Sequence, residues 1–178
     1  MPAGPHPGLE LRFPRLDEEA QFLRAHHTTT PDYPNFLHYH AEGMDFATYL
    51  QTLREQQQGV NPPTPRHVAS SFLFAFDGAR IVGRVSIRHQ LNEFLLRNGG
   101  HIGYVVVPEF RGRGYASAML AKALVIARDE LGIARALLTC AEDNAASIKV
   151  IERNGGMFEG FSEEFLPRVR RYWIGTSR

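Results

Sequence analysis

The amino-acid sequence predicts a mixed α+β domain in which helices flank a mostly antiparallel sheet. Two observations carry this prediction. The first half contains apolar strands joined by a tight Asp77-Gly78 turn, whereas the second half alternates strands with amphipathic helices. The chain of 178 residues is long enough for one well-buried domain and short for two. We therefore expect residues 1–178 to form a single domain.

The composition is that of a soluble globular protein, with 43% hydrophobic and 22% charged residues. The net charge of +1 gives no argument for a nucleic-acid or a membrane partner. The single cysteine, Cys140, excludes an internal disulfide, and no apolar run approaches the roughly 20 residues of a membrane span. Residues 1–8 lack the features of a signal peptide, so we expect a loose N-terminal tail on a cytoplasmic protein.

The N-terminal third is expected to supply one strand and two helices. Alternating residues predict a strand over 9–13, and Asp17 is placed to cap the helix that follows. Residues 28–39 are rich in threonine, proline and aromatics, which indicates an irregular loop. Helical spacing of apolar residues predicts a second helix over about 45–57, and a proline-rich stretch over 61–65 ends this region.

The middle of the chain predicts a hairpin and the strand that follows it. Residues 68–76 and 81–89 read as the two strands of the hairpin. Residues 91–95 suggest a short helical turn, which is closed by glycines before a strand over 101–107.

The C-terminal third predicts two helices and three strands. A strand over 134–140, a helix over 144–153 and two strands over 157–161 and 170–174 follow a long amphipathic helix. The apolar stripe of that long helix ends before Gly132 and consists of Met119, Leu120, Ala123, Leu124, Ala127 and Leu131.

The stretch 105–116 carries the most chemical information. Pro108 ends a β-branched strand because proline cannot donate to a ladder, and Arg111-Gly112-Arg113-Gly114 then leads directly into a helix. Glycines let backbone N–H groups approach a ligand closely, and the helix dipole adds positive potential at the same place. This arrangement indicates a phosphate or pyrophosphate site. The alternative is a surface turn with solvated arginines.

Two familiar phosphate-binding patterns do not fit this loop. Ser117 stands where a dinucleotide fingerprint needs its third glycine, and the Gly-Lys-Ser/Thr of a P-loop is absent. Arg111-Gly112-Arg113-Gly114-Tyr115-Ala116 instead resembles the Arg/Gln-x-x-Gly-x-Gly/Ala signature of the GNAT acetyltransferases. In that family the loop holds the pyrophosphate of acetyl-CoA, so the resemblance implies acetyl-CoA as cosubstrate.

A second motif strengthens the resemblance. Asn144-Ala145-Ala146-Ser147 opens a helix after a strand, like the Asn-x-x-Ser motif of the GNAT family, although Asn144 alone would read as a helix cap. The stretches 88–92, 99–104 and 138–140 are similar to a bacterial group of predicted GNAT acetyltransferases of unknown substrate. The resemblance covers roughly residues 81–174 and implies the GNAT fold, whose central sheet splays between the fourth and fifth strands.

Carried over position by position, the resemblance assigns a cofactor site. The backbone of residues 104–106 is expected to bond the pantetheine arm, and the N–H groups of residues 112–117 the pyrophosphate. The predicted cofactor-binding residues are Tyr104, Val105, Val106, Arg111, Gly112, Arg113, Gly114, Tyr115, Ala116, Ser117, Asn144 and Ser147.

The implied function is transfer of an acetyl group from acetyl-CoA to a primary amine by direct attack. Many family members carry a tyrosine seven residues after the motif asparagine, where it can protonate the departing thiolate, but Ile151 stands there. This departure keeps a second hypothesis open, a non-catalytic acyl-CoA-binding or sensing module. A third hypothesis, nucleic-acid binding through the arginines of 168–171, rests on those residues alone.

His101, Tyr104 and Asn144 are the predicted catalytic residues. His101 lies just before the strand that feeds the loop, and a histidine with a pKa near ~6.5 suits a general base. Its alternative role is to pack beside Gly99-Gly100 and bond a carbonyl. Tyr104 is a candidate proton donor or a ring in the cleft wall.

The remaining reactive residues need no special chemistry. His26-His27 and His38-Tyr39-His40 lack a cysteine or carboxylate at a familiar zinc spacing, so we expect solvated or substrate-side histidines and no metal. Cys140 is expected in the core. An exposed aromatic strand at Tyr172-Trp173 would suit a homodimer. The sequence does not identify the amine acceptor.

Overall fold

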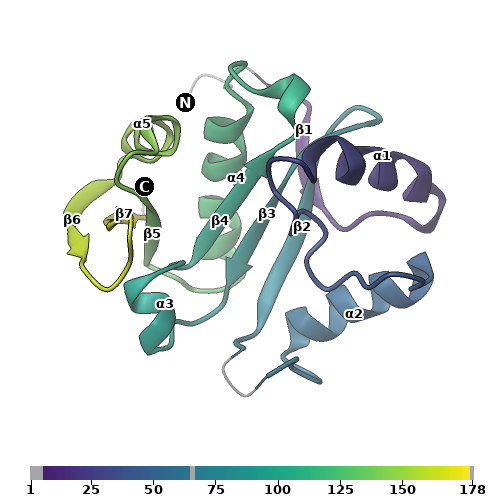
Figure 1. Ribbon diagram of the computed structural model, residues 1–178, viewed down its shortest axis with the longest axis horizontal. Coiled ribbons are helices and arrows are strands. Elements are labelled where there is room, and N and C mark those ends of the chain that lie inside the picture. The colour runs from purple at the N-terminus through teal and green to yellow at the C-terminus, as the bar shows by residue number, and fades with distance from the viewer. Residues whose placement is uncertain (1–5, 65–66, 177–178) are drawn as a thin grey trace.

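The computed structural model describes residues 6–64 and 67–176, which form two antiparallel sheets (Figure 1). The first sheet has the strand order β1-β2-β3-β4 and the second the order β5-β7-β6. The strands are β1 (Leu9–Arg12), β2 (Ser70–Asp77), β3 (Arg80–Arg88), β4 (Ile102–Val106), β5 (Arg135–Ala141), β6 (Met157–Ser162) and β7 (Val169–Gly175). The helices are α1 (Glu19–Thr29), α2 (Phe46–Gln58), α3 (Glu93–Arg97), α4 (Tyr115–Asp129) and α5 (Ala145–Arg153), and 3-10 turns cover Leu16–Glu18 and Pro108–Phe110.

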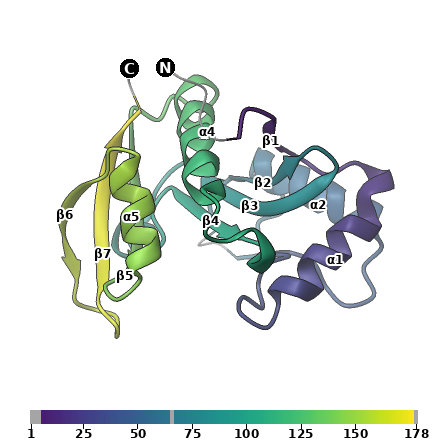
Figure 2. The same cartoon turned by 90° about the horizontal axis from the view of Figure 1, so that it is seen from above.

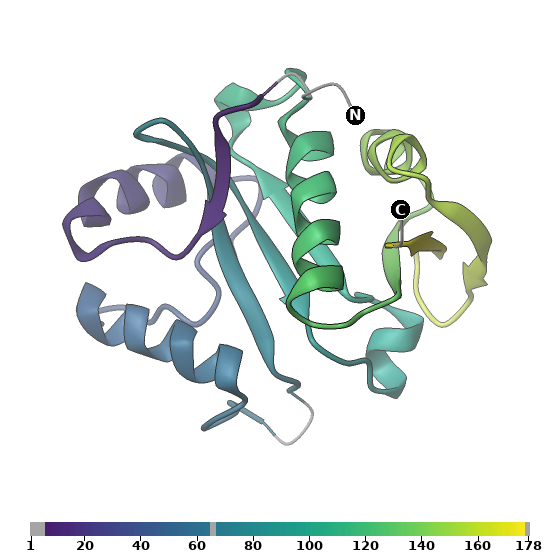
Figure 3. The ribbon, with the colours of Figure 1, turned by 180° about the vertical axis from the view of Figure 1, so that it is seen from behind.

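Helices cover both faces of the first sheet. α1 and α2 lie on one face, whereas α4 lies on the other and contacts β1, β3 and β4 (Figures 1 and 3). α5 packs against α4 and β5, so it joins the second sheet to the first, as the view from above shows (Figure 2). The predicted mixed α/β architecture with antiparallel sheets is confirmed.

An aromatic cluster forms the core between the first sheet and the helices α1 and α2. Phe22, Tyr49 and Phe74 are fully buried. The ring centroids of Phe22 and Phe74 lie 4.7 Å apart, and those of Phe22 and Tyr49 lie 5.2 Å apart. Tilted rings at such distances combine area burial with favourable edge-to-face contact, so this cluster fixes both helices on the sheet.

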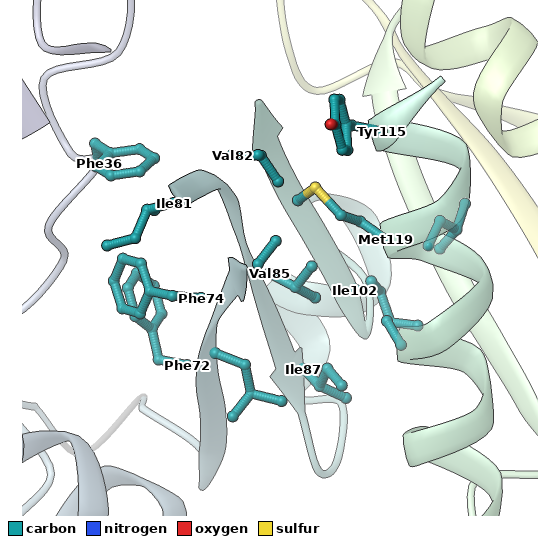
Figure 4. Packing of buried hydrophobic residues seen from close by; sticks show 14 of the residues in the cluster. Phe36, Phe72, Phe74, Ile81, Val82, Val85, Ile87, Ile102, Tyr115 and Met119 are labelled. Atoms are coloured by element: carbon teal, nitrogen blue, oxygen red, sulfur yellow. The ribbon is translucent and has the colours of Figure 1, made fainter. Parts of the chain in front are cut away.

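The opposite face of the sheet packs closely on α4. Met119 of α4 points toward Val82 and Val85 of β3 (Figure 4). A Cβ atom at Gly83 would collide with the carbonyl oxygen of Val105 and with the Met119 side chain. Glycine at this position therefore permits the close approach of β3, β4 and α4.

The two sheets meet at one point and part beyond it. His101 donates its backbone N–H to the Leu137 carbonyl at 2.7 Å, and its Nδ1 accepts the Leu137 N–H at 2.9 Å. A Cβ atom at Gly100 would collide with the Leu137 backbone, so glycine is required at this contact. Beyond it, β4 and β5 belong to separate ladders within the described chain. The predicted splay between the fourth and fifth strands is confirmed, and β4 presents an open edge.

Most predicted elements are confirmed, but one predicted cap is wrong. Asp45 caps α2, since its carboxylate accepts the Thr48 N–H at 3.0 Å. Asp17 does not cap α1, because it lies inside the 3-10 turn Leu16–Glu18. The Glu18 carboxylate instead accepts the Arg15 N–H at 2.7 Å.

The predicted exposed aromatic strand is also wrong. β7 is the central strand of the second sheet, Tyr172 is fully buried there, and Trp173 is partly buried, so neither ring is an exposed one. The homodimer therefore stays a prediction without this support. Of the loose tail expected over residues 1–8, residues 1–5 lie outside the described residues, and His6 stacks on Tyr115 with ring centroids 3.8 Å apart.

Candidate active site

A cavity of about 630 Å³ opens where β4 and β5 part. Its walls come from β3, β4 and the loop between α1 and α2 on one side, and from β5 and α5 on the other. Three sequence-predicted site residues line it, namely Tyr104, Val105 and Ser147. His101 and Asn144 are not among the described residues of this lining.

The cavity crosses the edge of β4 from one face of the sheet to the other. Val105 lies opposite Arg84 of β3, and Tyr104 lies opposite Val85. Because neighbouring side chains of a strand alternate, Tyr104 and Val105 point to opposite faces. Both nevertheless line the same cavity. Two molecules that approach from opposite faces can thus meet beside β4.

The backbone N–H and carbonyl groups of β4 also alternate in direction from one residue to the next. The N–H of Val107 bonds to the Val82 carbonyl of β3. In an antiparallel pair only alternate residues face the partner, so Tyr104 and Val106 direct their N–H and carbonyl groups to the open edge. The Val106 carbonyl accepts a hydrogen bond from Arg111 Nε at 3.1 Å, which agrees with this direction. The open edge is a row of backbone donors and acceptors.

The glycine-rich loop ends at the N-terminus of α4. Gly112 and Gly114 have φ values of +73° and +84°, which side-chain-bearing residues rarely adopt. The Ala118 N–H bonds to the Gly114 carbonyl at 3.2 Å. The N–H groups of residues 115–117 precede this bond and have no intrahelical acceptor. They are available to an anion at the positive end of the helix dipole.

The two loop arginines have different surroundings. Arg111 donates from Nη1 to Asp32 in the α1–α2 loop at 2.6 Å, and both side chains are about half exposed. Such an exposed ion pair is weak because solvent screens it, so an incoming phosphate can compete for Arg111. The Arg113 guanidinium carbon lies 5.9 Å from the Phe110 ring centroid.

Tyr115 and Ser117 hold the loop in place with their side chains. The Tyr115 hydroxyl donates to Asp77 at 2.5 Å, which raises the pKa of the phenol. His6 covers the other side of the same ring. The Ser117 hydroxyl accepts from Asn154 of the α5 C-terminus at 3.0 Å. These contacts fix the loop relative to β2 and α5.

The second motif forms the start of α5. The Asn144 side chain accepts the Ser147 N–H at 3.0 Å and so acts as the N-cap. Ser147 and Ile151 lie one turn apart and both line the cavity. The Tyr104 hydroxyl approaches the Ser147 carbonyl at 3.5 Å. Burial raises the pKa of Tyr104 to about 12, so its phenol keeps its proton at neutral pH.

His101 lies at the closed end of the splay. It is 8% exposed, and its Nδ1 is occupied by the Leu137 N–H. Its pKa is lowered by burial and by the charge of Arg88. This geometry supports the packing role considered for the residue in the sequence analysis. The catalytic role of His101 stays a prediction.

Five residues that the sequence analysis does not join into a site form the far end of the cavity. We call this group the arginine end, and it consists of His38, Tyr39, His67, Arg84 and Arg88. The α1–α2 loop supplies the first two, the segment before β2 supplies His67, and β3 supplies the arginines. One signal was present in the sequence, since two arginines four residues apart interrupt an otherwise apolar strand and therefore share one face.

The described part of the chain gives no evidence of a reactive cysteine or of a metal site. Cys140 is buried, and burial raises the pKa of its thiol to about 11, which agrees with the predicted core position. Among the residues that the structure describes, no group of three or more histidine, cysteine, aspartate or glutamate side chains is arranged to hold a metal ion. Within residues 6–64 and 67–176, no helix has the length and apolar character needed to cross a membrane.

Comparisons with a family model, with curated proteins and with solved structures all find acetyltransferases. A family model described as an acetyltransferase (GNAT) domain matches residues 9–157. Among curated proteins, the uncharacterized N-acetyltransferase YnaD of Bacillus subtilis (strain 168) is 31% identical over 72 residues. That match spans 40% of this chain and 42% of YnaD, so it covers less than half of either protein.

Two solved structures resemble the whole fold. The microcin C7 self-immunity acetyltransferase MccE, in complex with acetyl-CoA and AMP, has a TM-score of 0.67 at 18% identity and covers 94% of this chain and 92% of its own. The ribosomal L7/L12 alpha-N-protein acetyltransferase RimL, in complex with coenzyme A, has a TM-score of 0.66 at 19% identity and covers 94% of both chains. At these identities the likeness concerns the fold.

Proposed function

The chain belongs to the GNAT acetyltransferase family and is therefore an acyltransferase, and from this premise we propose that it transfers an acetyl group from acetyl-CoA to a primary amine by direct attack. One observation carries the proposal: the cavity crosses the open edge of β4. A thioester along that edge and an amine from the opposite face of the sheet would meet in one enclosed space.

The cofactor is proposed to lie along β4 and over the start of α4. The outward backbone groups of Tyr104 and Val106 would bond the pantetheine arm, and the amides of residues 112–117 would bond the pyrophosphate. Arg113, and Arg111 once it leaves Asp32, would add charge to these donors. We call this part of the site the cofactor end. The complexes of MccE with acetyl-CoA and of RimL with coenzyme A support this choice of cosubstrate.

The chemical step needs few side chains. The neutral amine attacks the thioester carbonyl carbon, a C–N bond forms, and the carbonyl oxygen becomes an oxyanion. Collapse of this intermediate restores the carbonyl, breaks the C–S bond and releases the CoA thiolate; the attacking nitrogen loses one proton, which balances the proton that the thiolate gains. The outward N–H of Val106 is the proposed donor to the oxyanion. Because the two reactants are held side by side, positioning supplies much of the rate enhancement.

Tyr104 is the proposed acid for the departing thiolate. Its hydroxyl approaches the Ser147 carbonyl, one turn from Ile151, on the face of α5 that lines the cavity. Ile151 occupies the place of the tyrosine found in many family members, so Tyr104 brings a phenol to the same region from β4. Its pKa of about 12 means that the phenol holds a proton at neutral pH.

His38 is the proposed base for the ammonium form of the amine. It lines the cavity, and its pKa is lowered by burial and by the neighbouring charges of Arg84 and His67. A histidine with a lowered pKa is neutral at pH 7, and from the far end of the cavity it can accept a proton through water.

The direct test is turnover of acetyl-CoA with a panel of amines, read as thiol release and as the mass of the acetylated product. We expect thiol release that depends on the amine and equals the product formed. Tight binding of acetyl-CoA without product from any amine would contradict the proposal and would favour an acyl-CoA-binding module.

A further inference from the structure

The arginine end of the cavity contains a buried cation without a carboxylate partner. Arg84 is 4% exposed, and its guanidinium lies between the Phe72 ring, 4.6 Å away, and the Tyr33 ring, 5.1 Å away. One nitrogen donates to the Asn35 carbonyl at 3.1 Å. The buried Nε has no hydrogen-bond partner among the described residues. Burial is also what lowers the pKa of Arg84.

A second guanidinium lies on the same face of β3. Arg88 is two pleats further along the strand, and it donates to the carbonyls of Gly99 and Gly100 at 3.0 and 3.2 Å. Those partners are neutral. No ion pair within the described chain involves either arginine. The charges of Arg84 and Arg88 reinforce each other at this end of the cavity.

The remaining lining adds no negative charge. None of the described residues that line the cavity is an aspartate or a glutamate. The side chains around the arginines are the imidazoles of His38 and His67 and the phenols of Tyr33 and Tyr39, and none of them is a carboxylate. A purely cationic amine would meet two positive charges and no attraction. A buried, unpaired charge is unfavourable unless a ligand or partner neutralises it.

We propose that the amine acceptor also carries an oxyanion, a carboxylate or a phosphate, and that Arg84 with Arg88 binds this group while the amine points toward β4. This inference rests on the proposed acetyl transfer and names its substrate class. Arg84 lines the cavity, and its planar guanidinium would donate to such an oxyanion through charge-assisted hydrogen bonds, which are both strong and directional. The flanking rings of Phe72 and Tyr33 exclude water and so strengthen the contact.

The test compares amines that differ only in the acidic group. L-Tyrosine is paired with tyramine for the carboxylate, and O-phosphoethanolamine with ethanolamine for the phosphate. Each pair is measured by kcat/KM with acetyl-CoA, and by calorimetry on the protein saturated with coenzyme A, which needs no turnover. The variants are Arg84→Met and, as a matched control that removes an exposed charge from α1, Arg24→Met.

We expect the acid-bearing member of at least one pair to be preferred by roughly 10- to 100-fold, the size of a charge-assisted contact. Arg84→Met should abolish that preference, and Arg24→Met should keep it. The wild-type comparison by itself remains decisive if Arg84→Met does not fold. Equal or better use of the plain amines would overturn the oxyanion site and leave acetyl transfer intact. Arg84-dependent binding of the acidic amines without acetylation would instead support the oxyanion site and contradict the proposed function.

Discussion

The proposed cofactor end of the site and the arginine end of the cavity differ in the kind of group that each offers to a ligand. The cofactor end consists of backbone amides along the edge of β4 and at the start of α4, and the side chains of Tyr115 and Ser117 only hold that backbone in place. The arginine end consists of side chains from three separate segments, with Arg84 and Arg88 at its centre.

The two ends therefore differ in which amino-acid substitutions they tolerate. A site made of amides depends on backbone shape, so it tolerates side-chain substitution except where a glycine is required. A site made of side chains changes its ligand whenever one of them changes. We therefore expect substitutions at the cofactor end to affect acetyl-CoA and those at the arginine end to affect the acceptor.

The largest expected effect is at Gly112. A Cβ atom at Gly112, whose φ is +73°, would meet no protein atom within 4 Å, so we expect the damage to come from backbone strain and from crowding of the pyrophosphate. We expect Gly112→Val to weaken CoA binding by roughly 100-fold, since two lost charge-assisted hydrogen bonds of about 1.5 kcal/mol each amount to two decades. Calorimetry with coenzyme A measures this.

Gly132 provides the matched control at the other end of α4. Its φ is +65°, and a Cβ atom there also meets nothing within 4 Å. Gly132→Val should therefore share the strain, about 1–2 kcal/mol, without any loss of CoA affinity. If both variants lose CoA binding equally, strain in α4 explains the result and the loop is not the pyrophosphate site.

The second effect concerns Tyr104, where the two ends meet. Tyr104→Phe removes the proposed acid but keeps the ring, so we expect kcat to fall by ~10²-fold with little change in the KM for acetyl-CoA. The pKa of about 12 also means that deprotonation of Tyr104 produces no loss of rate between pH 7 and 10. Initial rates of the wild type and of Tyr104→Phe between pH 7 and pH 10 measure both the fall in kcat and the pH dependence.

Tyr39 is the control for this substitution. It lies at the arginine end, where its hydroxyl is 3.5 Å from the Ser70 hydroxyl. Tyr39→Phe should change the KM of the acceptor and spare kcat. A Tyr104→Phe enzyme with wild-type kcat would show that the thiolate leaves without help from this phenol.

The same contrast explains how much of the molecule the sequence predicts. The loop 111–117 and the cap Asn144 are local patterns, in which a few consecutive residues determine the backbone, and both are found where they are expected. The strands and helices are predicted for the same reason, because their periodicity is local.

The arginine end could not be predicted in this way. His38 and Arg84 come within reach of each other only after β2 and β3 pair and the α1–α2 loop folds over them. His101 shows a related limit. Its position before a strand suggests a cleft, but the parting of two sheets decides that its Nδ1 faces Leu137 instead. The positions of the arginine end and of His101 both depend on contacts between segments that lie far apart in the sequence.

The third prediction separates two histidines by their response to pH. The pKa of His38 is lowered by burial and nearby charge, so the neutral base is lost only as the pH falls through a value below the ordinary pKa of about 6.5. The acidic limb of kcat/KM should therefore belong to His38. We expect His38→Gln to lower the rate at pH 7 by about 10-fold or more and to flatten that limb.

His101 should affect stability instead. Its lowered folded-state pKa means that its stabilising contribution is present above about pH 6.5 and is lost as the pH falls through the folded value. His101→Ala leaves the Leu137 N–H without its acceptor, which costs about 1–3 kcal/mol. His101→Asn restores an acceptor that does not titrate, so it should recover stability and weaken its pH dependence. A flattened acidic limb in His101→Asn would return the catalytic role to this residue.

The smallest effect is expected at Asn144, which lies beside the cofactor end. Its side chain accepts the Ser147 N–H at 3.0 Å, so Asn144→Ala should lower the free energy of unfolding by about 1 kcal/mol, as loss of an N-cap does. If the residue also borders the pantetheine arm, the KM for acetyl-CoA should rise a few-fold as well. Asp45→Ala is the matched control, because it removes the equivalent cap from α2, outside the cavity. Thermal melts and initial rates of the two variants decide the question. Equal loss of melting temperature with unchanged KM in both would make Asn144 a helix cap and nothing more, and the cofactor end would then consist of β4 and the glycine-rich loop alone.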